Sequence, residues 1–456
     1  MHLLQRTHDL AVEFLDSLAT RPVGRPADFG RMVECAGGRL PAAGEEAVRV
    51  IEKLSSAIDA GLVATPGPRY FGFVIGGAVP AALAADWLTS AWDQNGFSFA
   101  SSPAAAVVEE IAARWLIDLF GLRKSASVGF TTGCTMANFT GLAAARHAAY
   151  RQIGWDVERQ GLQGAPAVTV IASEESHVSI FAALQMLGMG RDRVMKVAAD
   201  EQGRMRAGEL RAALAAIETP FIVCAQAGNV NTGAFDPLLE IAACVHARDG
   251  WLHVDGAFGL WAAASPAYRE LVRGIDLADS IAVDCHKWLN VPYDSGVVFV
   301  RDRAAHYAAM SLSAAYYAPP TEMTRDNHNW VPEASRRSRG FAVYAAMRSL
   351  GRNGIAEMID RCCALAGRMA ERLASGEGVE ILNDVVLNQV LVRFNNSDEL
   401  TPEVIRRVQA DGTCWLSGTT WHGLQAMRIS VSNWSTSEAD IDASAAAILR
   451  CAAGVG

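Results

Sequence analysis

Short apolar segments rich in β-branched residues recur along the middle of the chain and constrain its fold more than any other feature. They are continuous rather than alternating, which is typical of strands buried on both faces of a sheet. Helical patterns separate most of them. The segments lie at residues 168–172, 221–225, 251–254, 281–283 and 297–300. This alternation predicts an α/β fold with a mostly parallel central sheet covered by helices.

The two ends of the chain have different patterns, so we predict three segments. Residues 1–65 read as short helices with an apolar face, and they are too small to be stable alone. We expect this segment to pack on a partner subunit. Residues 66–344 are predicted to form the large α/β domain. Residues 345–456 alternate between helical and strand-like patterns and predict a smaller α+β domain, whose last helix begins with a capping box from Ser435 to Glu438.

Composition narrows the possible partners. The 456 residues are 51% apolar and 20% charged, which suits a folded chain with a large core. Forty Lys and Arg against 49 Asp and Glu give a net charge of −9 without a basic run, so we expect no nucleic-acid partner. No stretch stays apolar over the ~20 residues that a membrane span needs. We therefore expect no membrane partner either.

The nine cysteines are scattered along the chain, and none forms a CxxC pair. This pattern indicates neither a zinc site nor a disulfide framework, so we expect no metal. The N-terminal residues also lack the apolar core of a signal peptide. A reducing, cytoplasmic location is the resulting expectation.

Lys287 and Asp255 each follow an apolar segment, and together they suggest a chemistry. A lysine amine can form a Schiff base with the aldehyde of pyridoxal 5'-phosphate. A carboxylate can keep the pyridine nitrogen of that cofactor protonated, so that the ring accepts electrons. Either residue alone would be an ordinary polar residue at a strand end. As a pair they predict a pyridoxal-phosphate site, in which burial is expected to lower the pKa of Lys287.

Other polar groups are expected at the same edge, because ligands gather at the carboxyl ends of strands in open α/β sheets. The turn at residues 131–135 precedes a helix, whose first N–H groups can bind a phosphate. A plain helix cap explains that turn equally well. His177 follows the segment 168–172, where an imidazole can stack on a planar ring. The turn at residues 228–233 is the weakest signal, since Gly and Asn suit any turn.

Four motifs share the order and spacing of one known family. They are Thr132-Gly133-Cys134-Thr135, Ser176-His177, His253-Val254-Asp255-Gly256-Ala257 and Asp284-Cys285-His286-Lys287-Trp288. The chain resembles the group II pyridoxal-phosphate-dependent amino acid decarboxylases, which include aromatic-amino-acid and glutamate decarboxylases. The resemblance is clear from about residue 65 to residue 350. It implies a fold-type I enzyme, a pyridoxal 5'-phosphate cofactor and a homodimer with the site near the subunit interface.

The resemblance also implies a role for each matching residue. Lys287 would bond to the cofactor, Asp255 would pair with its ring nitrogen, and His177 would stack on the ring. Asn229 stands where many relatives have a threonine, and Cys134 replaces a smaller residue. The other residues implied to bind the cofactor, beside these five, are Gly133, Thr135, Ala257, Asp284 and His286.

Two substrate-handling roles are left with alternatives. Tyr316, its neighbour Tyr317 or His177 would return a proton to the substrate α-carbon. Arg336 would meet the substrate carboxylate, with Arg428 as a competing anchor. For Arg337 and Arg339, which lie close by in the sequence, surface or interdomain ion pairs are the simpler explanation.

These assignments predict the α-decarboxylation of an L-amino acid to an amine and CO2, with Lys287, His177, Tyr316 and Asp255 as catalytic residues. Phe73 lies in an aromatic segment that resembles the wall of the substrate pocket, and no charge selects an acidic side chain, so an aromatic substrate is preferred. The alternatives are an aldehyde synthase or a carbon–carbon lyase using the same cofactor, or a binding protein without a cofactor. A nucleotide site is disfavoured, because no glycine-rich phosphate motif follows a strand.

Overall fold

The computed structural model describes residues 2–25, 27–311 and 325–454. The chain divides into two units: a large unit of residues 76–364 and 383–389, and a small unit of residues 1–75, 365–382 and 390–456. These borders differ from the predicted ones at 65/66 and 344/345. The reason is helix α12 (Gly340–Ala374), which crosses the second predicted border with a kink only at Gly351, where φ is 64°.

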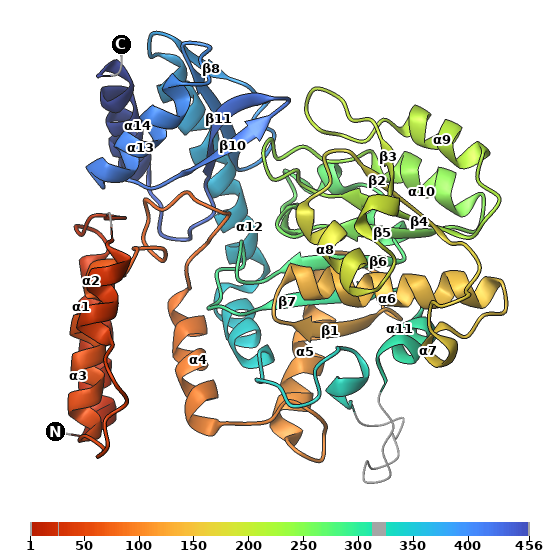
Figure 1. Cartoon of the computed structure of the whole chain (residues 1–456), viewed down its shortest axis with the longest axis horizontal. Coiled ribbons are helices and arrows are strands. Elements are labelled where there is room, and N and C mark those ends of the chain that lie inside the picture. Colours follow the sequence, from red (N-terminus) through yellow and green to blue (C-terminus); the bar gives the residue numbers. More distant parts are fainter. Residues whose placement is uncertain (1, 26, 312–324, 455–456) are drawn as a thin grey trace. The chain divides into compact units, whose positions relative to one another are not determined.

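A seven-stranded sheet forms the centre of the large unit (Figure 1), in the order β1-β7-β6-β5-β4-β2-β3. Strands β2 to β6 pair in parallel, whereas β7 runs antiparallel to both β6 and β1. The prediction of a mostly parallel sheet is therefore confirmed. The strands are β1 (Ser127–Thr131), β2 (Thr169–Ser173), β3 (Met195–Val197), β4 (Phe221–Gln226), β5 (Trp251–Asp255), β6 (Ser280–Asp284) and β7 (Gly296–Val300).

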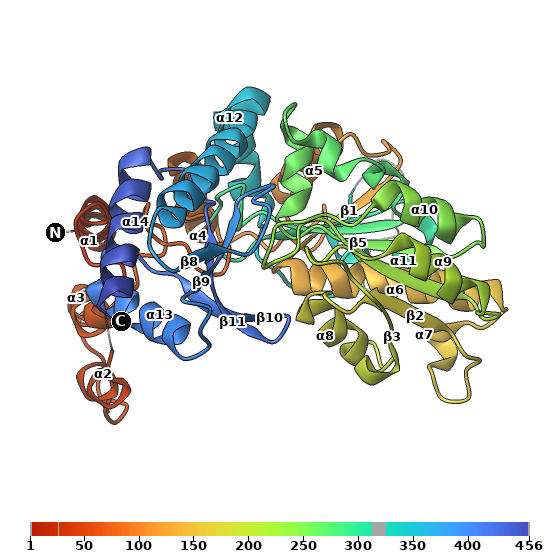
Figure 2. The ribbon, with the colours of Figure 1, turned by 90° about the horizontal axis from the view of Figure 1, so that it is seen from above.

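Helices cover both faces of this sheet. Figure 2 shows α6 and α8 on one side and α10 on the other. Five strands have only buried residues, as a sheet covered on both faces requires. Besides α12, the helices of this unit are α4 (Pro80–Trp92), α5 (Pro103–Leu119), α6 (Cys134–Gln152), α7 (Val157–Gln160), α8 (Val178–Met186), α9 (Ala207–Ala215), α10 (Leu238–His246) and α11 (Arg303–Met310).

Helix α6 brings its first turns close to the carboxyl ends of β5 and β6. Its buried face is rich in small residues, which allow a helix to lie close against a sheet. Gly141 shows how close the approach is, because a Cβ at this position would lie 3.0 Å from ring atoms of His253. The result is one edge of the sheet where Asp255, Asp284 and Cys134 end or begin their elements.

The small unit contains a four-stranded sheet in the order β10-β11-β9-β8. Its last helix does have a capping box, but the pair is Ser437 and Asp440 rather than Ser435 and Glu438. The elements of this unit are α1 (Leu3–Ser17), α2 (Phe29–Ala36), α3 (Ala47–Ile58), β8 (Val379–Ile381), β9 (Gln389–Phe394), α13 (Leu400–Asp411), β10 (Ser417–Trp421), β11 (Leu424–Ser430) and α14 (Glu438–Ala453).

The N-terminal segment packs on the C-terminal part of its own chain. The Val23 N–H donates to the Gly412 carbonyl oxygen at 2.8 Å, and the rings of Tyr70 and Trp415 stack with centroids 4.9 Å apart. These contacts explain why the segment groups with the small unit. Its predicted packing on a partner subunit stays a prediction. Among the described residues, no helix is long and apolar enough to cross a membrane.

Candidate active site

Lys287 follows β6 directly and faces a carboxylate. Its Nζ lies 3.0 Å from Oδ2 of Asp284, and both side chains are largely buried. Burial lowers the pKa of the Lys287 ammonium, but the nearby groups of Asp284, Cys134 and Asp255 raise it, and the resulting pKa lies above the ordinary value. The prediction that this pKa is lowered is therefore wrong for the protein without cofactor, because the neighbouring carboxylates outweigh burial.

Asp255 ends β5, is only 6% exposed and accepts hydrogen bonds at both carboxylate oxygens. The Ala257 N–H and the Cys134 thiol donate to Oδ1, at 3.1 and 3.4 Å. Asn138 Nδ2 and the Ser179 hydroxyl donate to Oδ2, at 3.0 and 3.3 Å. A buried carboxylate with this many donors is held in its charged form.

The electrostatics of the site favour the same state of Asp255. Burial raises the pKa of this carboxyl group, but the positive charges of His177 and Lys287 and the hydrogen bond from Asn138 outweigh it, so that the pKa lies below its ordinary value. Asp255 is thus an ionised group in a water-poor place, as the partner of a protonated ring nitrogen must be.

His177 reaches the same carboxylate through Ser179. The imidazole lies directly before helix α8, and its Nδ1 lies 2.7 Å from the Ser179 hydroxyl oxygen. That hydroxyl is in turn the donor to Asp255. Sequence reasoning found His177 and missed Ser179, although a serine two residues into a helix that begins at a site histidine is a usable signal.

The turn before α6 packs closely against His286 and Gly296. Gly133 is the N-cap of the helix, and a Cβ there would lie 3.1 Å from Cε1 of His286. A Cβ on Gly296 would lie 2.6 Å from Gly133 Cα. Only glycine fits such approaches. The helix start, the lysine amine and the ionised carboxylate thus lie along one edge, and this donor set fits pyridoxal 5'-phosphate.

Asp284 contacts both the first turn of helix α6 and Lys287. Its Oδ1 accepts the Cys134 N–H at 2.6 Å, and it lies 3.4 Å from Nε2 of His286. Its Oδ2 faces Lys287. Asp284 therefore pairs with the lysine and with the helix start, where a phosphate would meet a like charge. A direct contact of Asp284 with the cofactor stays a prediction, as do those of His286 and of the exposed Thr135.

Asn229 stabilises the turn between strand β4 and helix α10. Its Oδ1 accepts the N–H groups of Asn231 and Thr232, and its Nδ2 donates to the carbonyl oxygen of Glu175 at 3.4 Å. Glu175 lies two residues before His177, so Asn229 supports the segment that carries the histidine. Its contact with the cofactor, like that of the partly buried Ala257, stays a prediction.

Arg336 is placed where it binds another side chain. The guanidinium donates from Nη1 to both carboxylate oxygens of Glu109, at 2.8 and 3.0 Å, and from Nη2 to the Phe130 carbonyl oxygen at 2.7 Å. Both charged side chains are 1% exposed. A buried ion pair of this kind is strongly held, because each charge would be costly alone. These contacts give no support to the prediction that Arg336 meets the substrate carboxylate.

The remaining predicted residues have varied outcomes. Arg337 and Arg339 form the ion pairs predicted for them from the sequence, with Asp86 at 2.6 Å and Asp294 at 2.7 Å. Phe73 belongs to the small unit, where its ring lies 5.5 Å from that of Trp415. Tyr316 and Tyr317 lie outside the described residues. No group of three or more potential metal ligands occurs within residues 2–25, 27–311 and 325–454.

This edge of the sheet defines a fold-type I enzyme that uses pyridoxal 5'-phosphate. More particularly, the chain belongs to the pyridoxal-dependent decarboxylase family, a group of carboxy-lyases. The profile described as the pyridoxal-dependent decarboxylase conserved domain matches residues 30–395. The family and the cofactor expected from the sequence are thereby confirmed.

Relatives and solved structures agree with this assignment. The chain is 35% identical to L-2,4-diaminobutyrate decarboxylase of Rhizobium meliloti (strain 1021), over 70% of this chain and 63% of that protein. It is 25% identical to 4-hydroxyphenylacetaldehyde synthase of Rhodiola rosea, over 95% and 91% of the two chains. The crystal structure of mouse CSAD, 25% identical, superimposes with a TM-score of 0.91 over 99% of this chain and 98% of the other.

Proposed function

We propose that this chain removes the α-carboxyl group of an L-amino acid as CO2 and releases the corresponding amine, with an aromatic amino acid as the first candidate substrate. The observation that carries the proposal is the ionised, fully hydrogen-bonded Asp255 beside Lys287. The chain spans 63% of the length of its diaminobutyrate decarboxylase relative. The reaction and substrate of the whole protein are therefore part of the proposal.

Each residue has a distinct task in this reaction. Pyridoxal 5'-phosphate supplies an aldehyde that bonds to an amine, and a protonated ring that accepts an electron pair. Asp255 keeps a proton on the ring nitrogen. Lys287 would hold the cofactor through its amine, and Asp284, which lies 3.0 Å from that amine, would stabilise its protonated form. His177, whose Nδ1 lies 2.7 Å from the Ser179 hydroxyl oxygen, would stack on the cofactor ring and cover that face of it.

The substrate carboxylate needs a cation, and the choice between Arg336 and Arg428 stays part of the proposal. Among the described residues, the buried Nε of the Arg428 guanidinium has no hydrogen-bond partner. Burial lowers the pKa of its guanidinium, which indicates a cation placed away from water without a counter-charge. Arg336, in contrast, is already paired with Glu109. A return of the proton to the α-carbon by Tyr316 stays part of the proposal.

The names of the relatives make aldehyde formation the second candidate. One relative is named an aldehyde synthase, and the same cofactor site would serve it. The chain should be incubated with aromatic, diamino and acidic L-amino acids, and amine, aldehyde and CO2 measured together. We expect equal amounts of amine and CO2, with the highest kcat/KM for an aromatic substrate. Aldehyde in place of amine would support the synthase, and a preference for a diamino or acidic substrate would contradict the aromatic assignment.

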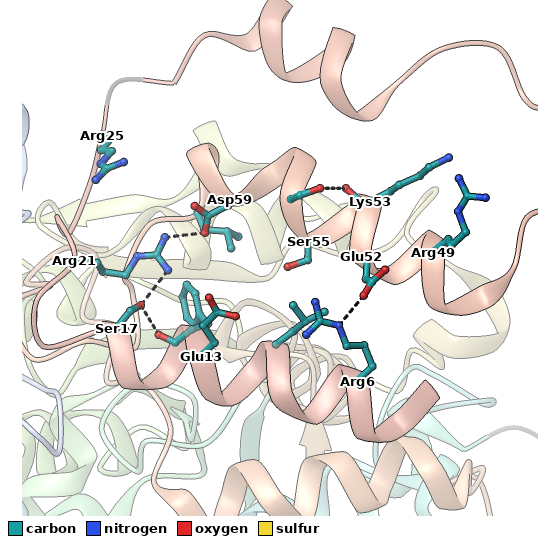
Figure 3. Close-up of a pocket in the computed structure, with 14 residues that line it drawn as sticks. Arg6, Glu13, Ser17, Arg21, Arg25, Arg49, Glu52, Lys53, Ser55 and Asp59 are labelled. Atoms are coloured by element: carbon teal, nitrogen blue, oxygen red, sulfur yellow. Dashed lines mark hydrogen bonds and ion pairs between the residues drawn. The ribbon is translucent and has the colours of Figure 1, made fainter. Parts of the chain in front are cut away.

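We further propose that the chain acts as a homodimer, as the sequence resemblance implies. Helices α1, α2 and α3 carry exposed apolar side chains that include Leu4, Val12, Phe29, Val33, Val50 and Leu54. A cavity of about 950 Å³ lies between α1 and α3 and is lined largely by charged residues, among them the Arg6–Glu52 and Arg21–Asp59 ion pairs (Figure 3). The exposed apolar side chains of these helices, rather than the charged cavity, favour association.

Light scattering should therefore give twice the 48.7 kDa mass of one chain. Replacing Val33 and Leu54 by Asp should shift the protein towards the monomer, because charges would then lie in the apolar surface. Replacement of Leu424, an exposed residue of β11, by Asp is the control and should leave the mass unchanged. A monomeric mass for the unaltered chain at micromolar concentration would contradict the proposal.

A further inference from the structure

A chain of hydrogen bonds leads from the interior of the large unit to Asp255. Trp251 Nε1 lies 2.9 Å from the Ser280 hydroxyl oxygen, which lies 2.8 Å from Nδ1 of His253. Nε2 of His253 lies 2.9 Å from Oδ1 of Asn138. The Asn138 amide then donates to Oδ2 of Asp255. Trp251 is 8% exposed, and the side chains of Ser280, His253 and Asn138 are fully or almost fully buried.

The Asp255 end of this chain, together with a neutral His253 ring, fixes the direction of every bond in it. The carboxylate only accepts, so the Asn138 amide donates to it and the Asn138 carbonyl oxygen faces Nε2 of His253, which must donate. Nδ1 of His253 therefore accepts, and the proton of the neutral ring lies on Nε2, from which it is donated to Asn138. The Asn138 carbonyl is thereby engaged, and its NH2 group is turned towards Asp255, which as a carboxylate only accepts.

The ring of His253 is neutral in this arrangement. Burial lowers its pKa to about 4, and the nearby charge of Asp255 raises it only partly. A protonated ring would donate to Ser280 as well, and the hydroxyl would then accept from both Trp251 and His253. Gly141 provides the space for the ring, since a Cβ on this residue would lie 3.0 Å from Nδ1 and Cε1 of His253.

We propose that Asn138 and His253 are positioning residues that keep Asp255 oriented and ionised, so that it can hold the proton of the cofactor ring nitrogen. The second NH2 hydrogen of Asn138 points to the Ser179 hydroxyl oxygen at 3.2 Å. Asn138 therefore donates both to Oδ2 of Asp255 and to Ser179, which is the other donor to that oxygen. Through Ser179 it also connects Asp255 with His177. Neither residue needs to touch the cofactor. The proposal rests on the role assigned to Asp255 under the proposed function.

The test is the affinity of the full-length protein for pyridoxal 5'-phosphate, together with the pH dependence of the visible absorbance of the loaded enzyme. Asn138→Ala and His253→Leu should each weaken cofactor binding about tenfold, the usual effect of losing one hydrogen bond to a buried charge. They should also shift the pH at which the absorbance changes. His253→Gln should stay close to the unaltered protein, because a Gln amide accepts and donates with the same polarity as the neutral ring.

Series coupling gives a further expectation. The double variant Asn138→Ala/His253→Leu should bind the cofactor no more weakly than Asn138→Ala alone, because His253 acts only through Asn138. The matched control is Thr140→Val on the same helix. Thr140 is fully buried, and its hydroxyl donates only to the carbonyl oxygen of Met136. This variant should leave both the affinity and the absorbance profile unchanged.

Each outcome supports or overturns the proposal. A folded Asn138→Ala protein with unaltered affinity and absorbance overturns it, and so does a His253→Gln variant as impaired as His253→Leu. Where Asn138→Ala does not fold, Ser280→Ala carries the test, with a smaller loss in the same direction expected and no change contradicting the proposal. Asp255→Asn distinguishes a failure of this proposal from a failure of the proposed function. If Asp255→Asn also has no effect on affinity or absorbance, the role assigned to Asp255 is wrong. If Asp255→Asn has an effect and the Asn138 and His253 variants have none, only their positioning role is wrong.

Discussion

Replacing Lys287 by Ala should lower the rate of amine formation by at least about a thousandfold, equal to about 4 kcal/mol of transition-state stabilisation. The variant removes the only amine that follows β6, and it leaves Asp284 as a buried carboxylate without its 3.0 Å partner. Alanine cannot bond to the cofactor aldehyde, so the visible absorbance of the lysine-bound cofactor should be lost. Borohydride, which bleaches that absorbance in the unaltered protein, should then have no effect.

The control for this variant is Lys124→Ala, which removes an exposed lysine that lies before β1. It should retain both activity and absorbance. Addition of a small alkylamine to Lys287→Ala should restore part of the rate, because a free amine can take over proton transfer at the position of Nζ. If Lys287→Ala instead kept most of its activity and its absorbance, Lys287 would not be the residue that bonds to the cofactor.

The fold was largely predictable because each central strand is buried on both faces and thus has an unmistakable apolar pattern. The segments at 168–172 and 281–283 lie within one residue of β2 and β6. Strand β3 was missed, since it has three residues and two of them are exposed. Strand β10 was missed because its middle residues face water and carry no apolar signal. Helix α12 runs on across the predicted border at 344/345, and its kink lies at Gly351.

The site was predictable to the extent that its residues lie at strand ends. Lys287 and Asp255 follow β6 and β5 directly, so sequence order alone places them on one edge. Asn138 and Ser179 were missed because their contacts with Asp255 join helices α6 and α8 to β5, and no local pattern reports such pairs. The sequence predicted that the pKa of Lys287 is lowered, whereas it is raised. The turn that brings the Asp284 carboxylate against the amine appears only in three dimensions.

Replacing Asp255 by Asn should lower kcat by about a hundredfold to a thousandfold, or about 3 to 4 kcal/mol. An amide has no negative charge, so it cannot hold a proton on the ring nitrogen, and the ring then accepts electrons poorly. The change is also unfavourable in the apo protein. The new NH2 group would face a donor whichever way it turned, either Asn138 Nδ2 or the Ala257 N–H. Steady-state kinetics and the absorbance spectrum at several pH values check the result.

Two comparisons make this result specific to charge at the ring nitrogen. Asp255→Glu keeps the charge and should recover part of the lost kcat, although the longer side chain disturbs the bonds to Asn138 and Ala257. Asp279→Asn is the matched control, because Asp279 is also a largely buried carboxylate that accepts the Leu252 N–H at 2.8 Å, at the opposite end of the same strands. It should cost stability but leave kcat nearly unchanged. Equal losses in Asp279→Asn and Asp255→Asn would mean that the sheet rather than the ring nitrogen had been perturbed, and the assigned role of Asp255 would fall.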